Sequence, residues 1–203
     1  MCGDRGLVLP QGRFGAYLFD CDGTLVDSMP LHFEAWNAGF RAAGASFRLE
    51  EEDFYGWAGI QEATIVAMLN ERHGSTVDPE TVITAKHAAF ECGIPGLGPV
   101  APVADFARSV VGKGKLGVVS GSPRRHVLAC LDAAGLGGLF ESLVTPEDVA
   151  PGRGKPHPDM FLLQAQQFGV EPAACLVFED GQSGIDAARA AGMESVFVPR
   201  GCS

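Results

Sequence analysis

Five short apolar runs, bounded by glycine, proline or polar residues, constrain the fold of this chain more than any other feature of its sequence. They span residues 16–19, 116–119, 142–144, 175–178 and 195–198. Hydrophobicity within each run is nearly continuous instead of alternating, which is typical of parallel strands covered on both faces. Helical stretches separate the later runs, at residues 100–111, 124–134, 158–168 and 183–191. This alternation predicts an α/β fold with a Rossmann-like, doubly wound parallel sheet.

The interval between the first apolar run and residue 100 contains no further strand candidate. Apolar residues recur there at helical spacing, at Leu31, Ala35 and Ala38 and again at Ile60, Thr64, Ala67 and Met68. We therefore expect a helical insertion of roughly 65 residues after the first strand. A stretch dense in glycine and proline, residues 93–99, returns the chain to the sheet. The predicted domains are a core of residues 1–27 and 95–203 and an inserted α-helical domain of residues 28–94.

Glycines mark the ends of the predicted helices. Gly135, Gly169 and Gly192 each follow a helical stretch and precede an apolar residue, and Gly44 follows an earlier helix at 29–43. Glycine accepts the left-handed conformation in which many helices end, and the apolar residue beyond it can pack back on the last turn. We expect a helix terminus at each of these positions.

The composition of the 203-residue chain argues against several classes of partner. It carries 15 basic and 25 acidic residues, a formal net charge of -10. Such a charge gives no drive for binding duplex nucleic acid and repels anionic membrane surfaces. No apolar run approaches the ~18 residues of a membrane span, and the first residues do not read as a signal peptide. No long apolar stripe is left over, so we expect a monomer.

Six cysteines are scattered along the chain. They are Cys2, Cys21, Cys92, Cys130, Cys175 and Cys202. Neither their spacing nor the length of the chain suggests a disulfide framework. We expect free thiols and a cytoplasmic location, where reducing conditions keep thiols free.

Two carboxylates, Asp20 and Asp22, follow the first apolar run, and Gly23 comes directly after them. The carboxyl end of a strand opens into the crevice where α/β sheets bind ligands. Two close carboxylates do not both ionise cheaply unless a cation lies between them, so the pair implies a metal or a shared proton. The alternative is a strand-to-turn junction in which these residues only form the turn.

The fourth apolar run leads directly into two further acids, Glu179 and Asp180. Together with Asp20 and Asp22 they would form a cluster of oxygen ligands, which suits a hard ion such as Mg²⁺. Capping of the following helix by Asp180 or Ser183 is the alternative, and the two roles are compatible.

Two more strand ends carry residues suited to an anion. Ser120, Gly121 and Ser122 precede a helix, whose backbone N–H groups attract negative charge, although Ser122 could also be a simple helix cap. Lys155 lies in a loop made rigid by prolines, where it is either a charge balancer or a solvated side chain. Residues 112–117 match the G-x-G-x-x-G pattern but precede a strand, so we do not expect a dinucleotide loop there.

These four segments, in this order and each at the carboxyl end of a strand, resemble the motifs of the haloacid dehalogenase (HAD) superfamily of phosphotransferases. The segments are 20–24, 120–122, 155–156 and 179–180. The helical insertion resembles the cap domain of that superfamily. Residues 31–36 and 178–185 are similar to the branch that contains β-phosphoglucomutase and fructose-1-phosphatase.

The resemblance implies a role for each acid. Asp20 would be the nucleophile that forms an aspartyl-phosphate, and Asp22 would be the general acid and then the general base. Mg²⁺ would be held by Asp20, the backbone carbonyl of Asp22 and Asp180, with Glu179 bound to the ion or beside its ligands.

The resemblance also implies a set of groups that bind the phosphoryl oxygens. They are Ser120, Gly121 and Ser122, the Lys155 ammonium, and the backbone N–H groups of Cys21 and Gly23. His32 either contributes to the active site from the insertion or packs against Trp36 one helical turn along.

The expected function is that of a Mg²⁺-dependent phosphatase, a phosphoric monoester hydrolase, acting on small phosphorylated metabolites and above all on sugar monophosphates. The alternative enzyme is a β-phosphoglucomutase-like phosphosugar mutase. The mutase branch carries a phosphate-binding arginine in its cap where this chain has residues 59–62, without arginine, although Arg72 or Lys86 could substitute. A binding module on the same scaffold is the non-enzymatic alternative.

Overall fold

A computed structural model of the chain describes residues 6–57 and 60–201. Contacts divide the chain into two compact units. The sheet unit comprises the chain up to Asp27 and from Leu97 onward, and the helical unit comprises Ser28–Gly96. The first boundary of this division coincides with the predicted one and the second lies two residues after it. The assignment of a core and a cap domain stays a prediction.

Five parallel strands form the sheet in the order β3-β2-β1-β4-β5. Their bounds are Ala16–Phe19 for β1, Lys115–Val119 for β2, Ser142–Val144 for β3, Cys175–Glu179 for β4 and Glu194–Phe197 for β5. Phe19, at the end of β1, pairs with Val118 of β2 and Phe178 of β4. Each strand begins and ends within one residue of the prediction, and the predicted fold class is confirmed.

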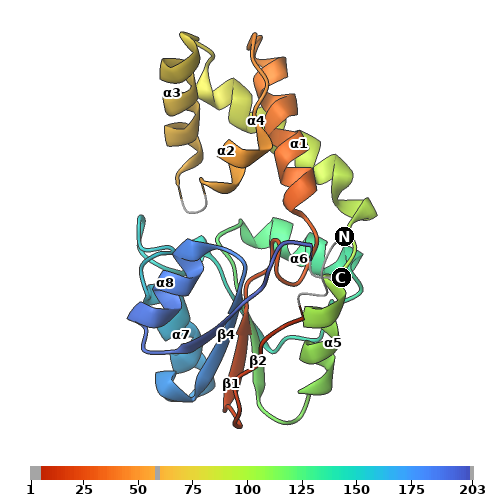
Figure 1. Cartoon of the computed structure of the whole chain (residues 1–203), viewed down its shortest axis with the longest axis vertical. Coiled ribbons are helices and arrows are strands. Elements are labelled where there is room, and N and C mark those ends of the chain that lie inside the picture. The colour runs from red at the N-terminus through yellow and green to blue at the C-terminus, as the bar shows by residue number, and fades with distance from the viewer. Residues whose placement is uncertain (1–5, 58–59, 202–203) are drawn as a thin grey trace. The chain divides into compact units, whose positions relative to one another are not determined.

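Helices cover both faces of the sheet, because the strand side chains are apolar on both (Figure 1). They are α5 (Ala101–Ser109), α6 (Arg124–Ala133), α7 (Asp159–Phe168) and α8 (Gln182–Ala190), with short 3₁₀ turns at Pro146–Asp148 and Pro172–Ala174. Leu18 and Val177 belong to the core cluster that α7 and α8 complete. On the opposite face, Tyr17 and Phe178 contact Phe106 of α5.

The predicted glycine termini are confirmed. Gly135 and Gly192 have positive φ angles of 67° and 74°. The residue after each glycine donates its N–H back into the last turn, Leu136 to the carbonyl of Leu131 at 2.8 Å and Met193 to that of Ala188 at 2.9 Å. These bonds satisfy carbonyls that a helix end would otherwise leave without partners.

The chain leaves β1 and returns to α5 through two segments that pair with each other. Val26 forms an antiparallel bridge with Pro99. Asp27 donates its N–H to the carbonyl of Gly98 at 3.0 Å, and Val100 donates to the carbonyl of Leu25 at 2.9 Å. The insertion therefore begins and ends at one place in the sheet unit.

The helical unit contains α1 (Met29–Ala42), α2 (Glu51–Tyr55), α3 (Glu62–His73) and α4 (Pro79–Gly93), followed by a 3₁₀ turn at Ile94–Gly96. Its core is a cluster of large apolar side chains that includes Trp36, Phe40, Phe54, Leu69 and Val82. α1 and α4 approach each other closely at Gly39, where an added Cβ would lie 2.5 Å from the carbonyl oxygen of Val82.

The predicted apolar face of the second insertion helix is wrong. Thr64, Ala67 and Met68 are exposed, whereas Ile65, Val66 and Leu69 are buried. The prediction counted Ile60 as helical, but that residue precedes the helix, and including it displaced the expected face by about one position.

The expectations about membrane spans and about cysteines can be checked for the described residues. Among the described residues, no helix is long and apolar enough to cross a membrane. Cys21, Cys92, Cys130 and Cys175 are free thiols, and Cys2 and Cys202 lie outside the described residues.

The close approach of α1 and α4 predicts that Gly39→Ala lowers the thermal unfolding temperature. The new methyl group would meet the backbone of Val82, which cannot move aside as a side chain can. Overpacking of this kind costs about 1–3 kcal/mol, against about 1 kcal/mol gained from the helix propensity of alanine. Gly96→Ala is the matched control, because its Cβ meets nothing within 4 Å. Equal melting temperatures for the two variants, measured by circular dichroism, would contradict the prediction.

Candidate active site

Three carboxylates meet at the carboxyl edge of the sheet. Asp20 directly follows β1, Glu179 ends β4, and Asp180 comes next in the chain. Because β1 and β4 are adjacent and parallel, their ends bring these acids together. One oxygen from each lies within 4.8 Å of the others, and Asp20 and Glu179 are only 7% and 3% exposed.

Lys155 provides the positive charge in this cluster. Its Nζ donates to Asp20 Oδ1 at 2.6 Å, to Glu179 Oε1 at 2.5 Å and to the carbonyl oxygen of Val119 at 2.8 Å. The ammonium group also lies 5.4 Å from the ring centroid of Phe161. All three ammonium protons therefore have acceptors, and the expectation that Lys155 balances the acids is consistent with these contacts.

The loop that carries Lys155 is held at its ends. Arg153 binds the carboxylate of Asp159 with two hydrogen bonds of 2.8 Å, which ties the loop to the first residue of α7. His157 donates its N–H to the carbonyl of Gly154 at 2.9 Å. These contacts fix the backbone on both sides of the lysine.

The electrostatics of the cluster are dominated by burial. Burial, aided by the neighbouring carboxylates and opposed by Lys155, raises the pKa of Asp20 well above its usual range. Burial and then the charge of Glu179 raise the pKa of Asp180 to about 7. Burial acts to lower the pKa of Lys155, but the charges of Asp20 and Glu179 outweigh it, so that pKa is raised. Lys155 is therefore charged, and one cation does not suffice for the three acids.

The donor set fits a divalent cation. It consists of carboxylate oxygens alone, which hard ions such as Mg²⁺ and Ca²⁺ prefer. Burial, aided by the neighbouring carboxylates, raises the pKa values of Asp20 and Asp180, and a bound cation would lower them. The carboxylate of Asp22 does not belong to this group, and the resemblance implied a metal ligand there only through the backbone carbonyl.

Asp22 interacts instead with the segment that follows β2. Ser122 Oγ donates to Asp22 Oδ2 at 2.6 Å. Ser120 is almost fully buried, and its hydroxyl oxygen accepts the backbone N–H of Ser122 at 3.1 Å. The structure thus brings the predicted serines next to the first pair of acids, and Gly121 between them is exposed, with open space around its Cα.

Gly23 has a different role from the one expected. Its backbone N–H donates to the carbonyl of Val26 at 2.8 Å, so it is not available to a phosphoryl oxygen. Its φ angle is 77°, a conformation that L side chains rarely adopt. Gly23 therefore serves to turn the chain after Asp22, and it does so within a loop in which the carbonyl of Cys21 accepts three N–H groups.

Two residues of the site were missed or undervalued in the sequence. Thr24 is fully buried, and its hydroxyl donates to Asp180 Oδ1 at 3.3 Å, which links the first acidic segment to the last. Gly184 leaves the space that the Glu179 carboxylate occupies, since an added Cβ would lie less than 2 Å from Glu179 Oε1. A glycine inside a helical pattern was the available signal, because it often has a packing reason.

His32 lies on α1 in the helical unit. Its ring stacks on that of Phe90 in α4, with ring centroids 4.0 Å apart. A role for His32 in the active site stays a prediction.

Known proteins resemble most of the chain. The sequence model of the haloacid dehalogenase-like hydrolase family matches residues 14–192. Fructose-1-phosphate phosphatase YqaB from Escherichia coli is 33% identical over 186 residues, which cover 92% of this chain and 97% of that protein.

Solved structures share the fold. A HAD family hydrolase from Deinococcus radiodurans, solved with bound phosphate and sodium, is 30% identical with a TM-score of 0.72, over 91% of this chain and 80% of that one. A putative β-phosphoglucomutase from Thermotoga maritima is 29% identical with a TM-score of 0.68, over 88% and 82%.

The family match spans most of the sequence, including all four segments that carry the acids, the serines and Lys155. The predicted family and its predicted branch are confirmed by these similarities. The chain belongs to the haloacid dehalogenase-like hydrolase family.

Proposed function

We propose that the protein is a Mg²⁺-dependent phosphatase of small phosphorylated metabolites, above all sugar monophosphates, and that it works through an aspartyl-phosphate. The observation that supports this proposal most strongly is that Asp20 lies at a strand end, within hydrogen-bonding distance of Lys155 and beside two further acids. The enzyme class, phosphoric monoester hydrolase, agrees with the similarity to a named fructose-1-phosphate phosphatase.

In the first half of the proposed reaction, a carboxylate oxygen of Asp20 attacks phosphorus and the bond to the leaving oxygen breaks. Asp22 gives its proton to that oxygen, so the sugar leaves as an alcohol. Ser122 holds the Asp22 side chain through its hydroxyl, at 2.6 Å. Lys155 fixes the orientation of the Asp20 carboxylate and can bind a phosphoryl oxygen.

In the second half, Asp22 takes a proton from water, the water oxygen attacks phosphorus, and the bond to Asp20 breaks to release inorganic phosphate. Asp20, Asp180 and the carbonyl of Asp22 would hold Mg²⁺, with Glu179 bound to it or beside its ligands. When bound, the ion would offset the charge of the carboxylates, so that an anionic phosphate can approach the anionic nucleophile.

Contacts within the helical unit favour the phosphatase over the mutase. A mutase must hold a second phosphate group while its bisphosphate intermediate turns round. The two candidate cations are both engaged with acids: Arg72 pairs with Asp53 at 2.5 Å, and Lys86 pairs with Glu62 at 2.7 Å. The segment that was compared with the phosphate-binding arginine of the mutase branch starts at Gly59, which lies outside the described residues.

The net charge and the cysteines support the proposals on partners and on location. The net charge of -10 supports a small phosphorylated substrate that binds with a metal ion, and not a nucleic acid or an anionic membrane. The four described cysteines are free thiols, which supports a cytoplasmic location. We propose that the protein acts as a monomer.

The assignment of the nucleophile predicts that Asp20→Asn abolishes turnover of p-nitrophenyl phosphate. The amide is a much weaker nucleophile, and loss of a nucleophile typically costs at least about a thousandfold in rate. Asp105→Asn is the matched control, because Asp105 is exposed on α5 and pairs with Arg108. Both variants should keep the wild-type circular dichroism spectrum. Wild-type turnover by folded Asp20→Asn would refute the assignment.

The raised pKa of Asp180 predicts that the metal-free protein loses stability as pH increases. The carboxyl group holds its proton to about pH 7 in the folded state, whereas its ordinary pKa is 3.8. Its stabilising contribution is therefore complete below about pH 4 and lost as pH rises through about 7. In EDTA, the melting temperature should fall between pH 5 and pH 8, and added Mg²⁺ should raise it more at pH 8.

Asp180→Asn should flatten this pH dependence and reduce the response to Mg²⁺, since the amide neither titrates nor carries charge. Asp105→Asn again serves as the control. If Asp180→Asn kept both the wild-type slope and the wild-type response in differential scanning fluorimetry, Asp180 would not be the group responsible.

The choice between phosphatase and mutase can be tested directly. We expect that incubation with glucose 1-phosphate, Mg²⁺ and a bisphosphate primer releases inorganic phosphate and forms no glucose 6-phosphate. Phosphate is measured colorimetrically, and glucose 6-phosphate through its dehydrogenase. Accumulation of glucose 6-phosphate in preference to phosphate would establish the mutase. A phosphate-release screen over phosphorylated sugars would then rank the substrates.

A further inference from the structure

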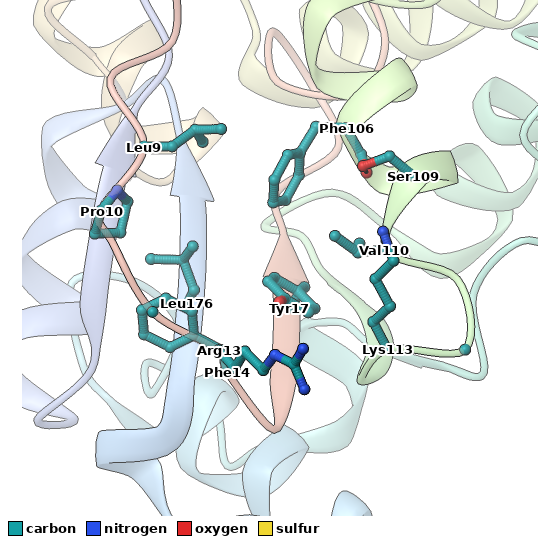
Figure 2. Close-up of a pocket in the computed structure, with 12 residues that line it drawn as sticks. Leu9, Pro10, Arg13, Phe14, Tyr17, Phe106, Ser109, Val110, Lys113 and Leu176 are labelled. Atoms are coloured by element: carbon teal, nitrogen blue, oxygen red, sulfur yellow. Dashed lines mark hydrogen bonds between the residues drawn. The ribbon is translucent and has the colours of Figure 1, made fainter.

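The sheet unit contains a cavity that has no part in the proposed reaction. Its volume is about 600 Å³, and it is lined by the segment before β1, by the start of β1 and β4, and by the end of α5 (Figure 2). Its apolar wall is formed by Phe14, Tyr17, Phe106, Val110 and Leu176. In Figure 2 the ring of Tyr17 lies between Leu176 on one side and Val110 on the other.

Two cations border this apolar wall. Arg13 comes from the segment before β1, and Lys113 comes from the turn between α5 and β2. Both side chains are exposed, and neither makes an ion pair or a side-chain hydrogen bond with a described residue. None of the described residues that line the cavity is acidic, although the chain has 25 acids and 15 bases. The local charge is therefore opposite to that of the whole protein.

The Tyr17 hydroxyl is a further polar group that has no side-chain partner among the described residues. The residue is 6% exposed, and it makes no side-chain hydrogen bond with the described residues. Tyr17 is one of the residues that line the cavity. A tyrosine that is nearly buried usually finds a hydrogen-bond partner for its hydroxyl, a role that a ligand in the cavity can fill.

Lys113 is not needed to complete the end of α5. The last-turn carbonyls already have donors: the N–H of Val110 bonds to Phe106 and Ala107, and that of Val111 bonds to Arg108. A lysine that only capped the helix would approach these carbonyls. The segment of Lys113 also matches the G-x-G-x-x-G pattern but leads into β2, so the lysine is not part of a dinucleotide loop.

The cavity lies away from the carboxylates. Tyr17 is the second residue of β1 and Asp20 follows its last, which places them about 10 Å apart along the strand. Phe106 connects the two regions, because the centroid of its ring lies 4.8 Å from that of Phe178, one residue before Glu179. A molecule in the cavity would therefore not occupy the phosphate position.

We propose that this cavity binds a small amphipathic anion, a planar apolar molecule that carries one sulfonate, carboxylate or phosphate group. The apolar body packs against the aromatic wall, and the anionic group binds Arg13 and Lys113. Hydrophobic burial supplies the affinity, and the two cations supply the selectivity for an anion.

The test uses two fluorescent probes that differ in charge. 8-Anilinonaphthalene-1-sulfonate carries the anionic group, and N-phenyl-1-naphthylamine is its neutral counterpart. The folded wild-type protein should bind the sulfonate at one site. The double variant Arg13→Gln/Lys113→Gln should bind it at least about tenfold more weakly, because two charge-assisted contacts are lost. Affinity for the neutral probe should stay within about twofold of wild type.

Two further variants locate the effect. Ser109→Glu places a carboxylate at the exposed rim of the cavity and should also weaken binding of the sulfonate. Arg108→Gln removes a neighbouring cation of α5 that already pairs with Asp105, and it should leave binding unchanged. The proposal is overturned if wild type does not bind the sulfonate, or if the double variant and Arg108→Gln bind it alike.

Discussion

The ion pairs of Lys155 with Asp20 and Glu179 are the interaction on which the site depends. Carboxylates buried to this extent are costly unless a cation is close, and here the cation comes from a loop distant in sequence. The lysine pairs with two of the three acids, yet burial keeps the pKa values of both Asp20 and Asp180 raised. The protein thus folds around three acids and one buried cation, and the acids form a donor set that fits a divalent cation.

The geometry of the parallel sheet supplies the rest of the arrangement. β1 lies between β2 and β4, so the end of the central strand faces the ends of both neighbours. At this edge, Gly184 makes room for the carboxylate of Glu179. The backbone carbonyl of Val119 accepts a hydrogen bond from the Lys155 ammonium group. Adding one methyl group at position 184 would displace the acid, although the helix itself would tolerate alanine.

Local patterns in the sequence predict the elements, and the contacts between elements decide the site. Continuous apolar runs located the strands closely because both faces of the sheet are covered, and the glycines marked helix ends because Gly135 and Gly192 need positive φ. The bond between Asp22 and Ser122 joins residues 100 positions apart, so no spacing could reveal it. The Gly23 N–H was misassigned because its partner, the carbonyl of Val26, depends on how the turn closes.

The antiparallel pairing of Val26 with Pro99 has a consequence for how such a protein can change over time. Because the insertion starts and ends at a single point, residues 28–96 form one closed loop inserted into the sheet unit. Closing a loop of twice the length costs only about 0.6 kcal/mol more. The inserted helices can therefore be lengthened, replaced or exchanged between relatives with little effect on the register of β1 with its neighbours. A chain built in this way can vary one part of its sequence freely while the reactive groups of the other part stay in place.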